Sequence, residues 1–204
     1  MTTTPAPATT WHHDTRVLDQ PYPTRNHAPN AVGDDTDTRL NLDPTQLDYL
    51  RAIHEAGHAV TVLTGQAHLH SAKIVTGEAT TQEGGVTYAC HLADGHAYAI
   101  FSAAGERAVD RWLREAGLWT PERAVAVEEG AHGDRASFLA INPHVGFGDR
   151  AVDYLVVHDL ADQALNTCWE AVLTVARALH RDQYLTGDAI AALAGLPNTP
   201  HCTA

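Results

Sequence analysis

The sequence has few cysteines and no excess of basic residues. Its three cysteines, Cys90, Cys168 and Cys202, are odd in number and lack the paired spacing of a disulfide framework or a cysteine-rich zinc site. They indicate free thiols in a reducing compartment. The formal charge of −12 argues against a general nucleic-acid-binding protein, because such a chain cannot neutralise a run of phosphates.

Long apolar runs are also missing. No stretch approaches the roughly 18–20 consecutive apolar residues of a membrane span, and the N-terminus lacks the basic start and apolar centre of a secretory signal. We therefore expect a cytoplasmic protein without a membrane partner. The 204 residues, of which 44% are hydrophobic, are enough for one domain with its own core and a tail.

One short stretch, His54-Glu55-Ala56-Gly57-His58, specifies a chemistry. Two histidines four positions apart lie on the same face of a helix, so both imidazoles can reach one tetrahedral Zn²⁺ ion. Zinc lowers the pKa of a bound water to roughly 7, and the carboxylate of Glu55 can take the proton of this water as it attacks a carbonyl. These three residues predict half of a hydrolytic zinc site, which still requires a further protein ligand.

Helical signals surround this motif. Asp43 is a natural N-cap, Pro44 suits the first helical turn, and Gly65 suits the C-terminal end. Together they predict a helix over residues 43–64. An amphipathic helix whose two histidines only face solvent is the alternative. The apolar positions that continue the helical period are Leu47, Leu50, Ala56, Val60 and Leu63.

The two ends of the chain differ from its centre. Residues 1–42 mix Thr, Pro, Asn and Asp without a sustained apolar period, and we expect them to form a disordered N-terminal arm. Residues 43–196 should form the domain. Residues 197–204 should be a fraying C-terminal tail.

Two short strands are expected after the motif helix. β-branched residues predict them at 71–76 and 86–90, joined by a polar turn. A hairpin beside a metal-binding helix could bind an extended peptide as an added strand, through backbone hydrogen bonds. A hairpin that only supports the fold is as compatible with these residues.

Helices dominate the remaining sequence. The three small residues Ala103, Ala104 and Gly105 favour tight core packing over a role in the site. The pattern as a whole predicts an α+β, predominantly α-helical fold, a zinc-binding helix bundle with a small β-hairpin or edge sheet. The expected helices span 94–116, a short segment from Pro121, 134–141, about 149–180 and 188–193.

Several carboxylates could complete the metal site. Asp134 stands at a predicted helix start, where backbone donors would keep it ionised; this suits a metal ligand, although residue chemistry alone favours an ordinary N-cap. Asp149 is a rival, because it lies in a second copy of the Gly-Asp-Arg-Ala tetrapeptide that contains Asp134. Glu128 and Glu129 remain further alternatives.

The chain from about Asp43 to Leu196 resembles the peptidase domain of the FtsH-type ATP-dependent zinc metalloproteases. The stretch from His54 to Val60 looks like that family's metal helix almost letter for letter, and the segment 104–108 is similar to the helix that follows, more loosely. The segment 85–88 resembles the family's substrate-binding edge strand; its residues are Gly85, Val86, Thr87 and Tyr88.

The resemblance also bears on the third ligand. In this family an aspartate that opens a helix after a Gly-Ala-Ser-Asn-Asp type of turn binds the zinc, and Gly130-Ala131-His132-Gly133-Asp134 falls in that place. It therefore implies that His54, His58 and Asp134 hold the zinc, with Glu55 as the catalytic base.

The sequence departs from this family in having no ATPase module and no phosphate-binding Gly-rich loop. The expected function is that of a stand-alone zinc metalloendopeptidase that hydrolyses peptide bonds in unfolded or flexible polypeptide. A separate ATPase or adaptor could supply this substrate. The alternatives are a non-catalytic, zinc-stabilised module that binds a peptide or partner, and a hydrolase of another amide or ester. Glu55 favours an enzyme, because a binding module needs no base there.

Overall fold

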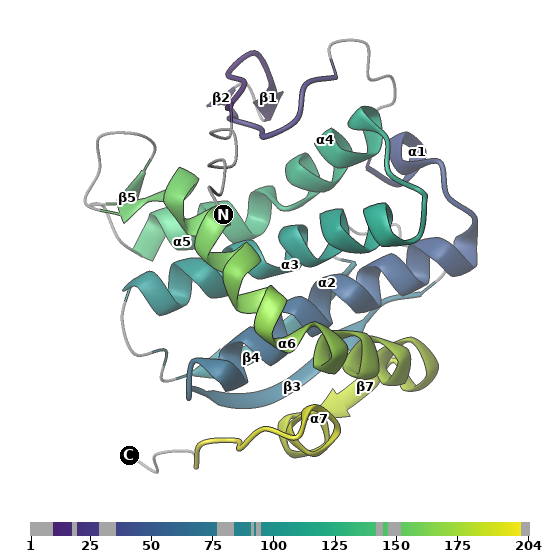
Figure 1. The fold of residues 1–204 in the computed structure, drawn as a ribbon, viewed down its shortest axis with the longest axis vertical. Helices are drawn as coiled ribbons and strands as arrows, with labels where there is room; N and C mark the ends of the chain where they lie inside the picture. Colours follow the sequence, from purple (N-terminus) through teal and green to yellow (C-terminus); the bar gives the residue numbers. More distant parts are fainter. Residues whose placement is uncertain are drawn as a thin grey trace, which may run out of the picture.

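The computed structural model describes residues 10–17, 20–28, 36–76, 84–90, 92, 95–141, 145–146 and 152–200. Its centre consists of three long helices, α2 (Pro44–Thr64), α3 (Gly95–Glu115) and α6 (Tyr154–Asp182). Helices α2 and α3 lie side by side, and α6 crosses both of them (Figure 1). Helix α6 bends at Cys168, whose backbone leaves the helical region (φ −127°, ψ 16°).

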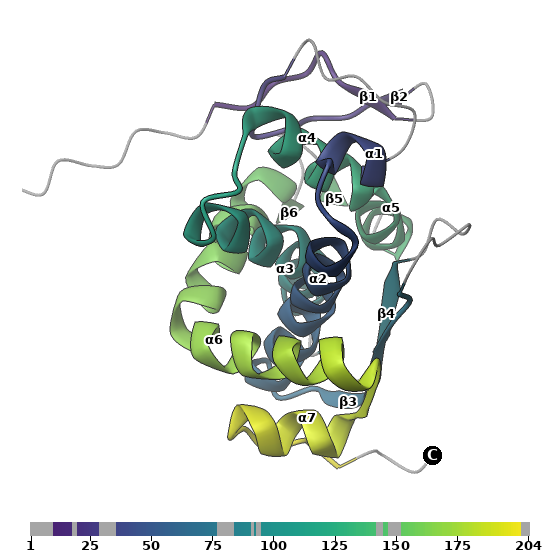
Figure 2. The ribbon, with the colours of Figure 1, turned by 90° about the vertical axis from the view of Figure 1, so that its right-hand side faces the viewer.

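A small antiparallel sheet lies against these helices. It consists of β4 (Gly85–Cys90), β3 (His68–Ile74) and β7 (Tyr184–Thr186), in that order. Strand β3 is central, so β4 is an edge strand among the described residues. Helix α7 (Gly187–Ala194) packs on the sheet beyond α6 (Figure 2). This helix-rich α+β architecture confirms the predicted fold class.

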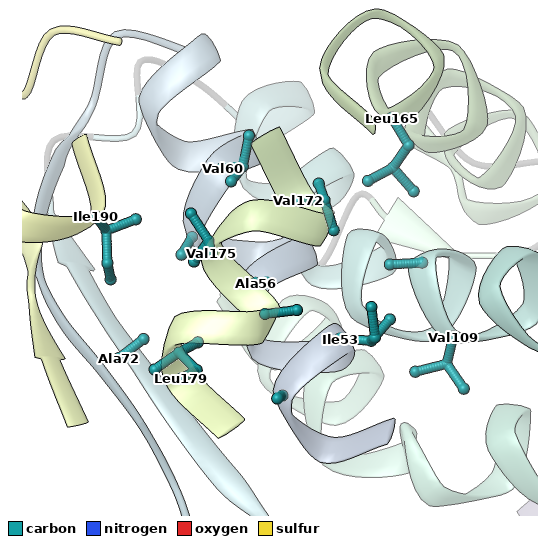
Figure 3. Packing of buried hydrophobic residues seen from close by; sticks show 14 of the residues in the cluster. Ile53, Ala56, Val60, Ala72, Val109, Leu165, Val172, Val175, Leu179 and Ile190 are labelled. Carbon is teal, nitrogen blue, oxygen red and sulfur yellow. The ribbon is translucent and has the colours of Figure 1, made fainter. Parts of the chain in front are cut away.

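Helix α2 forms because its N-terminal capping residues and its buried apolar middle both favour a helix. The Asp43 side chain accepts a hydrogen bond from the backbone N–H of Gln46 (3.0 Å), and the Gln46 side chain accepts one from the backbone of Asp43 (3.2 Å). This capping box stabilises the first turn. The middle of the helix is buried in one apolar cluster (Figure 3), whose labelled members include Ile53, Ala56, Val60, Val172, Val175, Leu179 and Ile190.

Small residues set the distance between α2 and α3. A Cβ atom on Gly57 would lie 2.7 Å from the carbonyl oxygen of Ala104 and 2.8 Å from Cβ of Ala108. Contacts of this length are not tolerated between packed atoms, so only glycine permits the approach. The small residues of α3 thus serve tight packing, as the sequence predicts for Ala104.

Shorter elements complete the fold. Helices α4 and α5 follow each other closely in the chain, and both lie in the upper half of the molecule in Figure 2. No helix among the described residues is long and apolar enough to cross a membrane. The shorter elements are α1 (Thr36–Leu40), α4 (Pro121–Gly130), α5 (His132–Ile141), β1 (Arg16–Val17), β2 (Gln20–Pro21), β5 (Val145–Gly146) and β6 (Val152–Asp153).

The expectation of a disordered arm over residues 1–42 does not hold for the described stretches of this segment. Backbone hydrogen bonds join His12 and Thr24 in both directions, at 2.8 and 2.9 Å. Tyr22, Thr24 and Leu40 are buried. Composition is a poor guide here because charged and polar contacts, rather than an apolar pattern, fix the segment on the domain.

The C-terminal tail also differs from expectation where it is described. The side chain of Asn198 accepts a hydrogen bond from the backbone N–H of Leu69 (2.9 Å) and donates one to its carbonyl (3.0 Å). These bonds fix residue 198 against strand β3, so the described part of the tail is held to the sheet.

Replacing Tyr22 by Ala should lower the free energy of unfolding by about 3 kcal/mol, the cost typical of truncating a buried aromatic side chain. Urea denaturation followed by circular dichroism measures this change. Tyr184 is the matched control because it is 54% exposed, and Tyr184→Ala should change stability by less than about 1 kcal/mol. Equal small losses in both variants would show that the N-terminal segment is not packed.

Candidate metal centre

Helix α2 places His54 and His58 one turn apart on the face that meets α3 and α5. The Nε2 atoms of the two rings are 2.9 Å apart. Helix α5 brings Oδ2 of Asp134 to 3.2 Å from Nε2 of His54 and 3.4 Å from Nε2 of His58. The structure therefore brings together the three residues that the sequence suggests as metal ligands, although Asp134 lies 80 residues after His54 in the chain.

These separations fit the donors of a tetrahedral metal ion. Ligand atoms about 2.0–2.1 Å from such an ion lie about 3.3 Å from one another. His54, His58 and Asp134 can offer two imidazole nitrogens and one carboxylate oxygen, a set of donors that suits a divalent cation. Three protein ligands leave a fourth position for water or substrate.

The ring of His58 is held in the orientation that a ligand needs. Its Nδ1–H donates a hydrogen bond to the backbone carbonyl of Phe101 (2.6 Å), and the ring is buried. This bond fixes a proton on Nδ1 and directs Nε2 at Asp134 and His54, so Nε2 is the ring atom that could bind a metal ion. No pattern in the sequence points to Phe101, because its backbone rather than its side chain acts here.

Gly105 makes room for the two imidazoles. A Cβ atom at this position would lie 2.5 Å from Nε2 of His58 and 2.6 Å from Nε2 of His54. The backbone of α3 thus runs directly over the two imidazole nitrogens. The prediction that Gly105 serves only core packing is incomplete, because packing α3 this closely is also what encloses the site.

The charges of the three residues support one another. Burial opposes an ionised Asp134, but the two imidazoles hold the pKa of its carboxyl well below the usual range. Burial likewise opposes a charged His58, but Asp134 and Glu55 raise the pKa of His58 to about 9. A cation at this centre would replace that proton, so metal binding and protonation compete.

Glu55 lies between the three candidate metal ligands and the edge strand. Its side chain is buried, and Oε2 accepts a hydrogen bond of 2.7 Å from the hydroxyl of Thr87 on β4. Burial raises the pKa of Glu55, and the neighbouring His54 and His58 oppose this shift. A carboxyl group with a raised pKa is suited to receive a proton near neutral pH.

One pocket of about 550 Å³ joins all these groups. His54, Glu55, His58 and Asp134 line it together with the whole segment 85–88 of strand β4. The edge strand predicted to bind substrate therefore borders the candidate metal centre. The other lining residues include Leu40, Leu50, Arg51, Tyr98, Phe101 and Ser102.

A buried charge network stands behind Asp134. Its neighbour Arg135 forms an ion pair with Glu106 on α3 (2.9 Å) and donates to the carbonyl of Pro23 (2.7 Å). His158 on α6 reaches the other oxygen of Glu106 at 2.7 Å. Burial favours protonation of Glu106, but Arg135 and His158 hold its pKa well below the ordinary value. This network fixes α5 against α3 and so determines where Asp134 lies.

The N-terminal segment contacts the same network at Glu128. The hydroxyl of Tyr22 donates to the backbone carbonyl of Glu128 (2.5 Å), while the backbone N–H of Arg25 and the side chain of Asn26 donate to its carboxylate (2.6 and 2.7 Å). Burial and the nearby Glu106 raise the pKa of Glu128 to about 7.

The other carboxylates considered as a third ligand do not join this group in the described structure. Glu128 is engaged by the N-terminal segment, and Glu129 forms an ion pair with Arg39 of α1. Neither belongs to the group formed by the two motif histidines and Asp134. Asp149 lies outside the described residues. Among the described carboxylates weighed as a third ligand, Asp134 is thus the one at the site.

A second group of metal-binding residue types occurs on the surface. His27 bonds Asp14 (Nε2–Oδ2 2.7 Å), and the rings of His12 and His27 are stacked at 4.8 Å and 13°. Two nearly parallel rings at this distance cannot both direct a nitrogen lone pair at one ion. An exposed hydrogen bond beside a stacked ring accounts for this arrangement.

Comparison of the sequence with models of known protein families and with curated proteins finds no match.

Gly105→Ala should abolish metal binding. The added Cβ atom would lie 2.5 Å from Nε2 of His58 and 2.6 Å from Nε2 of His54, so the rings or α3 must shift, and overpacking of this kind also costs about 1–3 kcal/mol of stability. Zinc content after dialysis, measured by atomic absorption beside a thermal melt of the metal-free protein, tests this expectation.

Gly133→Ala is the matched control, because a Cβ atom there meets nothing within 4 Å although Gly133 precedes Asp134. This variant should keep the zinc of the parent. The same measurement of zinc content on Asp134→Ala and Asp149→Ala tests the third ligand. Full zinc binding by Gly105→Ala, or loss of zinc in Asp149→Ala alone, would contradict the centre as described.

Proposed function

We propose that this protein is a zinc metalloendopeptidase that hydrolyses peptide bonds in unfolded or flexible polypeptide. The observation that carries the proposal is the position of Glu55. Its buried carboxylate lies between a His54–His58–Asp134 metal-binding group and an edge strand, and all of them line one pocket. A base, a metal-binding group and a surface for extended backbone in one pocket are the parts that peptide hydrolysis requires.

In this proposal His54, His58 and Asp134 hold the zinc ion. When bound, zinc lowers the pKa of a coordinated water to about 7 and polarises the scissile carbonyl. Glu55 accepts a proton from the attacking water at a carboxylate oxygen and then delivers it to the nitrogen of the leaving amine. Its raised pKa suits both transfers, since the carboxyl group must bind the proton and release it again.

Strand β4 orients the substrate in this proposal. Among the described strands it has a neighbour on one side only, so its other edge can pair with an extended peptide. Gly85, Val86, Thr87 and Tyr88 would hold the substrate through their backbone, largely independently of its sequence. A folded protein cannot present such a segment without opening locally.

We further propose that the protein works in the cytoplasm, with a separate ATPase or adaptor as a partner that supplies unfolded chains. Cys90 and Cys168 are free thiols, which supports a reducing compartment.

The competing function is a zinc-stabilised module that binds a peptide on β4 without cleaving it. A buried carboxylate at Glu55 argues against this alternative, because burying an ionisable group is costly and binding alone does not need it. The two functions differ in one measurable property, which is turnover.

Glu55→Gln should retain zinc and lose at least about 100-fold in kcat, because the amide keeps the size and the bond to Thr87 but cannot accept a proton. Cleavage of a fluorescently labelled, permanently unfolded protein measures this rate. Each variant is assayed with its zinc content determined and with a chelator control.

Equal turnover by the parent and Glu55→Gln would remove Glu55 as the base. If zinc-loaded parent protein binds the unfolded chain but never cleaves it, the binding module is the correct function.

Cleavage should also depend on the conformation of the substrate. A folded domain whose opening costs several kcal/mol exposes an extended segment in less than about 1% of molecules. The purified protein, with no ATPase added, should therefore cut a destabilised, unfolded variant at least about 100-fold faster than its folded counterpart of nearly identical sequence. Comparable initial rates on this matched pair would contradict recognition through the edge strand.

A further inference from the structure

The hydroxyl of Thr87 makes the contact between the edge strand and the proposed base. We infer that Thr87 is a positioning residue that holds the Glu55 carboxylate in place, so that one strand orients both the substrate and the base. This inference rests on the proposed function and adds to it a side-chain role for a residue otherwise expected to act through its backbone.

The first observation is the hydrogen bond of the Thr87 hydroxyl. Oγ1 of Thr87 donates its one proton to Oε2 of Glu55 at 2.7 Å, and the backbone carbonyl of Glu55, 3.3 Å from Oγ1, is a more distant second acceptor. Thr87 pairs with Ala72 of the central strand β3, which keeps its backbone in register. The hydroxyl is therefore presented from a strand whose position is fixed by the sheet.

The second observation is independent and concerns Gly85. A Cβ atom on this residue would lie 2.6 Å from Oε1 and 2.7 Å from Cγ of Glu55. The glycine thus lets the carboxylate lie directly against β4, where Thr87 can reach it. Residues 85 and 87 stand on the same face of the strand, since side chains alternate along it.

A hydroxyl donor matters here because Glu55 is buried. A buried carboxylate oxygen without a donor is unfavourable, and the three rotatable bonds of glutamate would otherwise allow the group to turn away. Valine has the shape of threonine but cannot donate, whereas serine keeps the donor and loses only a methyl group. The two substitutions thus separate hydrogen bonding from packing.

The test compares the zinc-loaded parent, Thr87→Val and Thr87→Ser on a permanently unfolded protein, with kcat and KM determined for each. Loss of base positioning should lower kcat of Thr87→Val by about 10-fold or more and leave KM and zinc content within about twofold. Thr87→Ser should recover most of the parent's kcat. Thermal melts of all three proteins show whether a variant is folded.

A packing role makes the opposite prediction, because Thr87→Val would then be tolerated and Thr87→Ser impaired. Such a result overturns the inference. A rise of kcat in Thr87→Val overturns it as well, since the hydroxyl would then be holding the base away from the substrate.

The proposed function and the role of Thr87 can be refuted separately. If the parent and Glu55→Gln are both inactive, the proposed function fails and the inference with it. If the parent is active, Glu55→Gln is inactive and Thr87→Val equals the parent, the function stands and only the role of Thr87 is refuted.

Discussion

The close contact of helices α2 and α3 is the constraint on which the centre depends. Gly57 admits the backbone of Ala104, and this approach brings Gly105 over the imidazoles of His54 and His58. The same approach places the carbonyl of Phe101 where it fixes the ring of His58. A wider separation would lose the hydrogen bond and the enclosure of the ligand nitrogens together. The glycine between the two motif histidines is thus as much a part of the site as the candidate ligands.

A second constraint holds the remaining ligand. Asp134 lies on a different helix from the histidines, and its position follows from the buried ion pair of its neighbour Arg135 with Glu106. Burying charges is costly unless each is paired and hydrogen-bonded, and removing one partner typically costs about 3–5 kcal/mol. Here the N-terminal segment supplies some of the partners, through the carbonyl of Pro23 and the ring of Tyr22 against Arg135. A segment that supplies none of the candidate ligands therefore helps to position Asp134.

Local signals in the sequence predict much of this structure, and long-range contacts account for what they miss. The capping residues, the helical period and the β-branched runs predict α2 and the two strands, because each reports on its own neighbours in the chain. The composition of residues 1–42 suggests disorder because the partners that hold residues such as Arg25 and Asn26 lie about 100 residues away, at Glu128. The same limit applies to Gly105 and to the hydroxyl of Thr87. Their roles depend on which helix or strand lies opposite, and no local pattern contains that information.

The central claim is that one zinc ion, one base and one edge strand act together on an extended peptide. A crystal structure of the zinc-loaded Glu55→Gln protein with an extended peptide substrate tests it most directly. We predict a single ion bound by Nε2 of His54, Nε2 of His58 and a carboxylate oxygen of Asp134, with the peptide hydrogen-bonded to the free edge of β4 and a carbonyl directed at the ion. An ion bound elsewhere, or a peptide that does not contact β4, would contradict this account.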